Sequence, residues 1–245
     1  MSAPRDWNAA SYARMSAPQE AMGREVLDRL VLAGNERVLD AGCGTGRVTA
    51  ALLERLPAGE VVAVDGSPSM VEQARAALPA DRVQTLVSDL VELELDRPVD
   101  AILSTATFHW IADHDRLFAR MYAALKPGGR LVAQCGGEGN VASVGAAVEH
   151  VAHPALAGWT GPWNFASPAA TEARLRAAGF REAWCWLQAL PVVPDDRHEY
   201  LSTVMLGSHL ERLDPSEHDA FVEAVDAEMP EGPIDYVRLN LLARR

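Results

Sequence analysis

Three glycines at alternating positions, Gly42, Gly44 and Gly46, form the part of the sequence whose spacing most directly suggests chemistry. They follow a short apolar segment ending in Asp40 and precede a segment with apolar residues at helical spacing. Glycines at such a junction let the backbone approach a ligand at the amino end of the helix. A nicotinamide dinucleotide fingerprint requires its third glycine three residues after the second, where this sequence has Arg47. The spacing therefore argues against that dinucleotide and leaves two alternatives, a site for another ligand and an ordinary strand-to-helix turn.

Polar side chains stand where four short apolar segments end, namely Asp40, Asp65, Asp89 and Ser104. A carboxylate at position 40 would repel a pyrophosphate and would suit a cation such as an amino group. The carboxylate of Asp65 can accept hydrogen bonds from both hydroxyls of a ribose, and that of Asp89 can accept from an adenine amino group. The alternative for Asp65 and Asp89 is that the acid caps the helix that follows it.

The elements that must hold these residues alternate between strands and helices. Strands are predicted at 37–40, 61–65, 83–87, 101–103 and 131–133, with helical apolar spacing in most of the intervals between them. This order predicts an α/β fold, a doubly wound and mostly parallel sheet with helices on both faces. Further strands at 184–193 and 236–241 would pair as an antiparallel end, which makes seven. Such sheets bind ligands at the carboxyl ends of their strands, where the polar residues stand.

Composition narrows the classes of partner. There are 22 Lys and Arg against 34 Asp and Glu, a net charge of −12, so neither a nucleic acid nor an anionic membrane is an expected partner. Three separated cysteines without a C-x-x-C pair, and no His/Asp/Glu ligand spacing, predict no metal site. No apolar stretch reaches the ~18 residues of a membrane span, and no signal peptide begins the sequence. We therefore expect a soluble, cytoplasmic protein.

Four segments together resemble the motifs of the class I S-adenosylmethionine-dependent methyltransferases. They are Val38–Gly46, Val64–Ser67, Ser88–Leu90 and Leu125–Leu131. The resemblance implies a Rossmann-like seven-stranded sheet, S-adenosylmethionine as cofactor and S-adenosylhomocysteine as product. The residues that it implies for cofactor binding are Tyr12, Asp40, Gly42, Cys43, Gly44, Thr45, Gly46, Asp65, Gly66, Ser67, Met70, Ser88, Asp89, Leu90, Ser104 and Thr105.

A narrower similarity is to the trans-aconitate methyltransferase branch. It is carried by Trp7, Asn8 and Tyr12 before the first helix and by Phe108–Asp113 after the fourth strand. It implies that Tyr12 lies near the sulfonium and Trp7 near the acceptor pocket; the alternative is that both anchor a terminal helix. The chain departs from the branch at 135–140, a glycine-rich segment of its own, so the resemblance does not identify the acceptor acid.

Six residues are candidates for the acceptor side, namely Trp7, His109, Trp110, Trp159, Trp163 and Arg238. His109 would serve either as a general base or as a wall of the pocket. Trp159 and Trp163, with Phe165, would line an apolar pocket or form a small core beneath a loop. Arg238 would pair either with an anionic acceptor or with an acid on a covering helix.

No Ser-, Gly- or Pro-rich linker divides the sequence, so we expect one methyltransferase domain over 1–245. Its expected parts are an N-terminal helical cover (1–34), a cofactor-binding half (37–135), a lid (136–166) hinged at its glycines, and a C-terminal half (167–245) with a helical insertion (195–230). The expected activity is methyl transfer by in-line displacement to a small molecule, through a carboxylate or other oxygen nucleophile. The alternatives are a non-catalytic S-adenosylmethionine-binding protein and a nicotinamide-dependent oxidoreductase.

Overall fold

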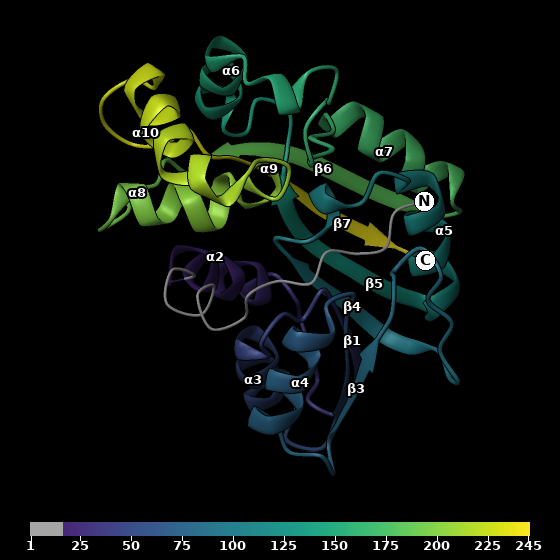
Figure 1. Cartoon of the computed structure of the whole chain (residues 1–245). Helices are drawn as coiled ribbons and strands as arrows, with labels where there is room; N and C mark the ends of the chain where they lie inside the picture. The colour runs from purple at the N-terminus through teal and green to yellow at the C-terminus, as the bar shows by residue number, and fades with distance from the viewer. Residues whose placement is uncertain (1–16) are drawn as a thin grey trace.

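A single seven-stranded sheet organises the chain (Figure 1), in a computed structural model that describes residues 17–245. The strand order is β3-β2-β1-β4-β5-β7-β6, and β7 runs antiparallel to both of its neighbours. The other strands run parallel to one another, which confirms the predicted fold and its antiparallel last strand. The strands are β1 (Arg37–Ala41), β2 (Glu60–Asp65), β3 (Val83–Val87), β4 (Val99–Thr105), β5 (Leu125–Gly136), β6 (Glu182–Ala189) and β7 (Val237–Arg244).

Helices cover both faces of the sheet because successive strand residues point to opposite sides. In β1, Val38 packs in a hydrophobic cluster with α2, α3 and α4, whereas Leu39 packs in a second cluster with α5 and α7. Both clusters are closed to solvent, so the apolar runs read from the sequence are strands buried on two sides. The helices named here are α2 (Ala17–Asp28), α3 (Arg47–Glu54), α4 (Pro68–Ala77), α5 (His114–Ala124) and α7 (Pro168–Ala177).

Two helices begin at a serine whose side chain caps the first turn. The hydroxyl of Ser67 accepts a hydrogen bond from the Met70 N–H at the start of α4. The hydroxyl of Ser167 accepts from the Ala170 N–H at the start of α7. In both helices proline occupies the first turn, where its missing N–H costs nothing.

A group of short helices forms a cap at one end of the molecule (Figure 1). The cap consists of residues 141–165 and 192–236, and its apolar side chains form a third hydrophobic cluster. Here the predicted lid and the predicted insertion meet, because α6 packs against α10. The cap helices are α6 (Ala142–Val151), α8 (Arg197–Tyr200), a π-helical turn (Leu201–Met205), α9 (Gly207–Leu210) and α10 (His218–Glu228), with 3-10 turns at Pro154–Leu156 and Pro215–Glu217.

The glycines expected to act as a hinge have a packing role. A Cβ at Gly136 would lie 2.5 Å from Cε1 of Phe165. A Cβ at Gly137 would lie 2.7 Å from side-chain atoms of Leu187 and Leu239. Close packing is therefore a sufficient reason for glycine at both positions.

The strand predicted at 184–193 is Glu182–Ala189 in the structure, and beyond it only Val192 forms a bridge, to Ile234. The predicted N-terminal helix is described as α2, whereas Trp7 and Tyr12 lie outside the described residues. No helix within residues 17–245 is long and apolar enough to cross a membrane.

Candidate active site

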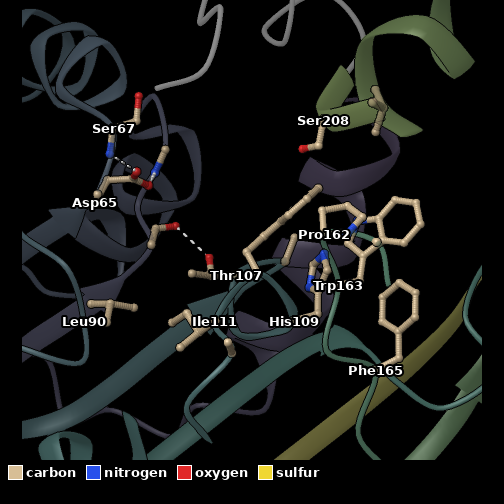
Figure 2. Close-up of a pocket in the computed structure, with 18 of the residues that line it drawn as sticks. Asp65, Ser67, Leu90, Thr107, His109, Ile111, Pro162, Trp163, Phe165 and Ser208 are labelled. Carbon is tan, nitrogen blue, oxygen red and sulfur yellow. Dashed lines mark hydrogen bonds between the residues drawn. The ribbon is translucent and has the colours of Figure 1, made fainter. Parts of the chain in front are cut away.

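A cavity of about 780 Å³ opens between the cap and the carboxyl ends of the strands. It is lined by the loops after β1, β2, β3 and β4 and by residues of the cap. The strand order reverses between β1 and β4, and doubly wound sheets bind ligands at that point. In Figure 2, Asp65, Ser67 and Leu90 lie on one side of the pocket, and Trp163 and Phe165 lie on the other.

The glycine loop is fitted closely against its neighbours. Gly42 has a φ of 90°, and a Cβ there would lie 2.0 Å from Oγ1 of Thr107 in the loop after β4. The Gly42 N–H donates to the carbonyl oxygen of Val64 at 2.7 Å. Gly44, by contrast, has nothing within 4 Å of a Cβ position. The backbone of the loop is therefore accessible from the cavity at Gly44, whereas at Gly42 it packs against Thr107 and is hydrogen-bonded to Val64 of β2.

Asp65 joins two of the loops that line the cavity. Its Oδ2 accepts from the Gly44 N–H at 2.9 Å, and its Oδ1 accepts from the Ser67 N–H at 2.9 Å. The side chain lines the cavity, as predicted, so its carboxylate both shapes the loops and faces the ligand space. At the next strand end, Asp89 lines the cavity and accepts from the Val91 N–H at 3.1 Å, beside the buried side chain of Leu90.

Asp40 does not line the cavity. It is fully buried, and its Oδ2 accepts from Oγ1 of Thr49 in α3 at 2.6 Å. Burial raises the pKa of its carboxyl to about 6, against the lowering effect of the Thr49 hydrogen bond, and the charge of Asp65 raises it further. Ser104 is turned inward as well, since its hydroxyl donates to the Ala41 carbonyl at 2.6 Å.

Most of the sequence-predicted site residues meet at this cavity. Those that line it are Gly42, Gly44, Asp65, Gly66, Ser67, Met70, Ser88, Asp89, Leu90, Thr105, His109, Trp110, Trp159, Trp163 and Arg238. Those within the described residues that do not line it are Asp40, Cys43, Thr45, Gly46 and Ser104.

His109 is a neutral hydrogen-bond donor in this geometry. Its Nδ1 accepts from the Gly136 N–H at 3.2 Å, and because a backbone N–H can only donate, the proton of the neutral ring is on Nε2. Burial is the main reason that the pKa of His109 lies well below 6.5; the nearby charges of Arg238 and His114 lower it further. His109 therefore suits a role as donor to an acceptor better than a role as general base.

Arg238 supplies a buried positive charge beside His109. It is 3% exposed, lines the cavity, and is the register partner of Gly136, the residue bonded to His109. Its guanidinium carbon lies 5.6 Å from the centre of the Tyr236 ring. The cavity thus holds a cation and an N–H donor on adjoining elements of one wall.

Aromatic rings continue that wall into the cap. The ring of Phe165 stacks on His109 at 5.8 Å and on Trp163 at 5.4 Å, with interplanar angles of 27° and 16°. Trp110 lies 6.1 Å from Trp163, and Trp159 lines the cavity further along with Arg212 over its face at 4.2 Å. The aromatic cluster predicted from the sequence therefore lines the cavity on the side opposite Asp65 and Ser67.

Sequence reasoning missed several cap residues of the cavity. Ser208, Glu211 and Arg212 have the spacing of one helix face, and Tyr236 is two residues before Arg238, so both patterns were present in the sequence. Their position depends on how the cap folds back over the sheet, which the local pattern does not encode. Within residues 17–245, no group of three or more His, Cys, Asp or Glu side chains could hold a metal ion.

Comparison with known proteins agrees with this geometry. Residues 38–129 match the family described as a methyltransferase domain. A trans-aconitate 2-methyltransferase from Methylobacterium radiotolerans is 29% identical over 92% of this chain and 91% of its own length. Other curated trans-aconitate 2-methyltransferases are 36 to 38% identical, and those alignments cover 53% of this chain and only about half of the relatives' length.

Solved structures share the fold. A chain from the Haloferax volcanii complex between the Trm112 methyltransferase activator and a methyltransferase is 21% identical, with a TM-score of 0.66, over 96% of this chain and 93% of that one. Phosphoethanolamine N-methyltransferase 2 of Haemonchus contortus, solved with S-adenosylhomocysteine, is 20% identical with a TM-score of 0.65, over 96% of this chain and 56% of that one. At these identities the likeness concerns the fold alone.

Proposed function

This chain is a class I S-adenosylmethionine-dependent methyltransferase similar to the trans-aconitate methyltransferase branch, and from that premise we propose that it methylates a carboxylate oxygen of a small organic acid. S-adenosylmethionine supplies an electrophilic methyl group on a positively charged sulfur, so that a carboxylate oxygen that takes the methyl becomes an ester and S-adenosylhomocysteine is released. The carbon–sulfur bond breaks as the carbon–oxygen bond forms, and the electron pair stays on sulfur.

The residues on the strand-end side of the cavity fit the cofactor. Gly44 has open space at its Cβ position, so its backbone can approach a ligand. The Asp65 carboxylate at the next strand end would accept the ribose hydroxyls, and Asp89 with Leu90 would bind the adenine. Asp40 would act indirectly, by supporting the glycine loop through Thr49.

The observation that carries the proposal is the pairing of Arg238 with His109. A buried guanidinium is stable beside a carboxylate, and a neutral imidazole with its proton on Nε2 can donate to the same group. Both residues line the cavity, so they would orient one carboxylate oxygen toward the methyl group. Correct positioning of two reactants can lower the activation free energy by ~7–11 kcal/mol.

A carboxylate acceptor also explains why no base is needed. A carboxylic acid is already ionised at neutral pH, so no proton has to leave the accepting oxygen. His109 is held as a donor by the Gly136 N–H and would be a poor base for a hydroxyl or amine. The aromatic side chains of the cap would keep water from the reacting groups, which strengthens the Arg238 interaction.

The test is the release of S-adenosylhomocysteine by the purified protein given S-adenosylmethionine and small acids. Arg238→Gln should lower kcat/KM at least ~100-fold, because hydrogen bonds to charged groups are worth ~1.5–3 kcal/mol and the carboxylate would lose its buried cation. Arg97→Gln is the matched control, since Arg97 is exposed at the amino end of β4 and should have no effect. Equal activity of Arg238→Gln and wild type, or turnover only on alcohols and amines, would contradict the proposal.

A further inference from the structure

Asn140 is a buried polar residue of the cavity wall, and we propose that it binds the acceptor. Its side-chain amide donates a hydrogen bond to an oxygen of the acceptor carboxylate, beside the donor that His109 provides. The inference rests on the proposed function, because it names a further residue that binds the proposed acceptor. It is carried by the turn that holds Asn140, by the hydrogen bond that orients its amide, and by the position of the amide next to His109.

A tight turn places Asn140 at the cavity. The turn spans 137–140 directly after β5, and within it the Asn140 N–H donates to the Gly137 carbonyl oxygen at 2.9 Å. Gly139 has a φ of 79°, a backbone conformation that glycine adopts without strain. The Gly137 N–H in turn donates to the Val237 carbonyl oxygen at 3.0 Å. Asn140 is therefore held against the start of β7, where it is 5% exposed and lines the cavity.

The orientation of the Asn140 amide follows from its partner. Its Oδ1 accepts from the Val237 N–H at 2.9 Å. Because a backbone N–H can only donate, the side-chain atom facing it is the oxygen, and Nδ2 keeps two hydrogens to donate elsewhere. No residue from 17 to 245 accepts from Nδ2, yet this nitrogen is not among the side-chain atoms of that range that are closed to solvent without a partner. The cavity therefore reaches Nδ2, which can donate to a ligand there.

The Asn140 amide lies beside the donor of His109. A Cβ placed on Gly136 would lie 2.9 Å from Nδ2 of Asn140, so the amide lies next to Gly136. The Gly136 N–H donates to Nδ1 of His109, whose ring lies against that of Phe165 (Figure 2). One residue thus adjoins both side chains. In both, a backbone N–H takes the accepting atom and leaves only donors for a ligand.

A pair of donors selects the kind of atom that it binds. A carboxylate oxygen carries lone pairs and no hydrogen, so it can accept from Nδ2 of Asn140 and from Nε2 of His109. The hydrogens of an amine or a hydroxyl find no acceptor in this pair. Hydrogen bonds to an ionised acceptor are roughly twice as strong as those between neutral groups. Because backbone bonds fix both donors before the ligand arrives, little conformational entropy is lost when they bind the carboxylate.

Asn140→Asp separates the proposed contact from the structural one. This substitution keeps the shape and an oxygen that accepts from the Val237 N–H, but it exchanges the Nδ2 donors for a second, negatively charged oxygen. The intact protein is given S-adenosylmethionine and trans-aconitate, malonate, benzoate or trans-cinnamate, and the acid with the highest wild-type kcat/KM is used for all variants. At about pH 8 we expect kcat/KM of Asn140→Asp to fall roughly 100-fold or more, because a hydrogen bond to the acceptor carboxylate is lost and a like charge faces it.

Asn35→Asp is the matched control. It makes the same chemical change at an exposed residue before β1 that does not line the cavity, so kcat/KM should stay at the wild-type value. Asn140→Ala removes the donor without adding a charge and should lower kcat/KM about tenfold or more. The affinity of both Asn140 variants for S-adenosylhomocysteine should be unchanged, which also shows that they are folded.

The pH profile of Asn140→Asp gives a readout that a purely structural role would not move. Burial raises the pKa of the new carboxyl, and once protonated this carboxyl can donate as the amide did. Between about pH 8 and about pH 5.5, the ratio of wild-type to variant kcat/KM should therefore shrink about tenfold or more. All other titratable groups are shared by the two proteins, so the change in this ratio reports the new carboxyl.

The outcomes separate the inference from the function on which it rests. Wild-type kcat/KM in either Asn140 variant would overturn the inference and leave the proposed function standing. A loss of S-adenosylhomocysteine affinity as large as the loss of kcat/KM would do the same, because Asn140 would then act on the cofactor side. If S-adenosylhomocysteine binds to the wild type but none of the acids is methylated, the proposed function and the inference are both overturned.

Discussion

Replacement of Asp65 by alanine tests the cofactor side of the cavity most sharply. The carboxylate accepts two backbone hydrogen bonds at 2.9 Å, from Gly44 and Ser67, and it faces the cavity. Hydrogen bonds to a charged group are worth ~1.5–3 kcal/mol each, and the partial exposure of this site to the cavity favours the lower value. Loss of the two backbone bonds would lower the stability of the loops, whereas the loss of affinity would come from the ribose hydroxyls, whose hydrogen bonds to the charged carboxylate would be lost.

We therefore expect Asp65→Ala to weaken the binding of S-adenosylhomocysteine by at least about 2 kcal/mol, or roughly 30-fold in Kd. Asp65→Asn should give a smaller loss, because its amide oxygen can still accept one of the two N–H groups. Asp89→Ala is the comparison at the next strand end and should also cost less, since Asp89 accepts a single bond, from Val91 at 3.1 Å.

The assay is isothermal titration calorimetry with S-adenosylhomocysteine, with thermal unfolding of each variant measured in the absence of ligand. The unfolding measurement separates loss of loop structure from loss of the ligand contact. Wild-type affinity in Asp65→Ala would refute the assignment, and so would a larger loss in Asp89→Ala.

Two further predictions concern pH. The kcat/KM for an acid acceptor should be flat from about pH 6.5 to 9, because the pKa of His109 lies well below its ordinary value and the ring stays neutral; a rising limb with a midpoint between pH 6.5 and 8 would indicate a general base. The pKa of Asp40 is raised from 3.8 to about 6 in the folded protein. Between about pH 4 and 6 the folded state therefore keeps a proton that the unfolded chain has lost. In denaturant unfolding, the free energy of unfolding of the wild type should therefore fall by on the order of 3 kcal/mol relative to that of Asp40→Asn as the pH rises through that window. Parallel pH profiles of the two proteins would contradict the argument that burial raises this pKa.

The sheet was predictable because its signal is local. Consecutive residues such as Val38 and Leu39 are both apolar because each strand is covered on two sides, and this produces short apolar runs separated by segments with helical spacing. The glycine loop and Asp65 were predictable for the same reason: a ligand at the carboxyl ends of parallel strands requires small or polar residues there.

The direction of each side chain at those strand ends was not predictable. Both Asp40 and Asp65 were predicted to stand at a strand end, but β1 continues to Ala41; Asp40 bonds to Thr49, whereas Asp65, the last residue of β2, lines the cavity. One residue of register decides which face a strand residue meets, and the sequence pattern does not locate the last residue of a strand that well.

The cap was the least predictable region. Its helices were expected as a separate lid and helical insertion, but α6 of the lid packs against α10 of the insertion across a long stretch of sequence. Position 236 illustrates the limit, because the last strand was predicted to begin at Tyr236, whereas this residue lies before β7 and lines the cavity. Only the packing of the cap onto the sheet brings this residue to the site.

The central claim is that this cavity transfers a methyl group to a carboxylate, and the most direct measurement follows that group by mass spectrometry. The protein would be incubated with S-adenosylmethionine labelled with a trideuterated methyl group and with a panel of small carboxylic acids. The account predicts a product about 17 mass units heavier than the acid, because a trideuteromethyl group replaces the hydrogen of the carboxylic acid in the ester. Alkali should hydrolyse this ester back to the acid. Label found on carbon or nitrogen, stable to alkali, or S-adenosylhomocysteine formed without any labelled ester from an acid, would contradict it.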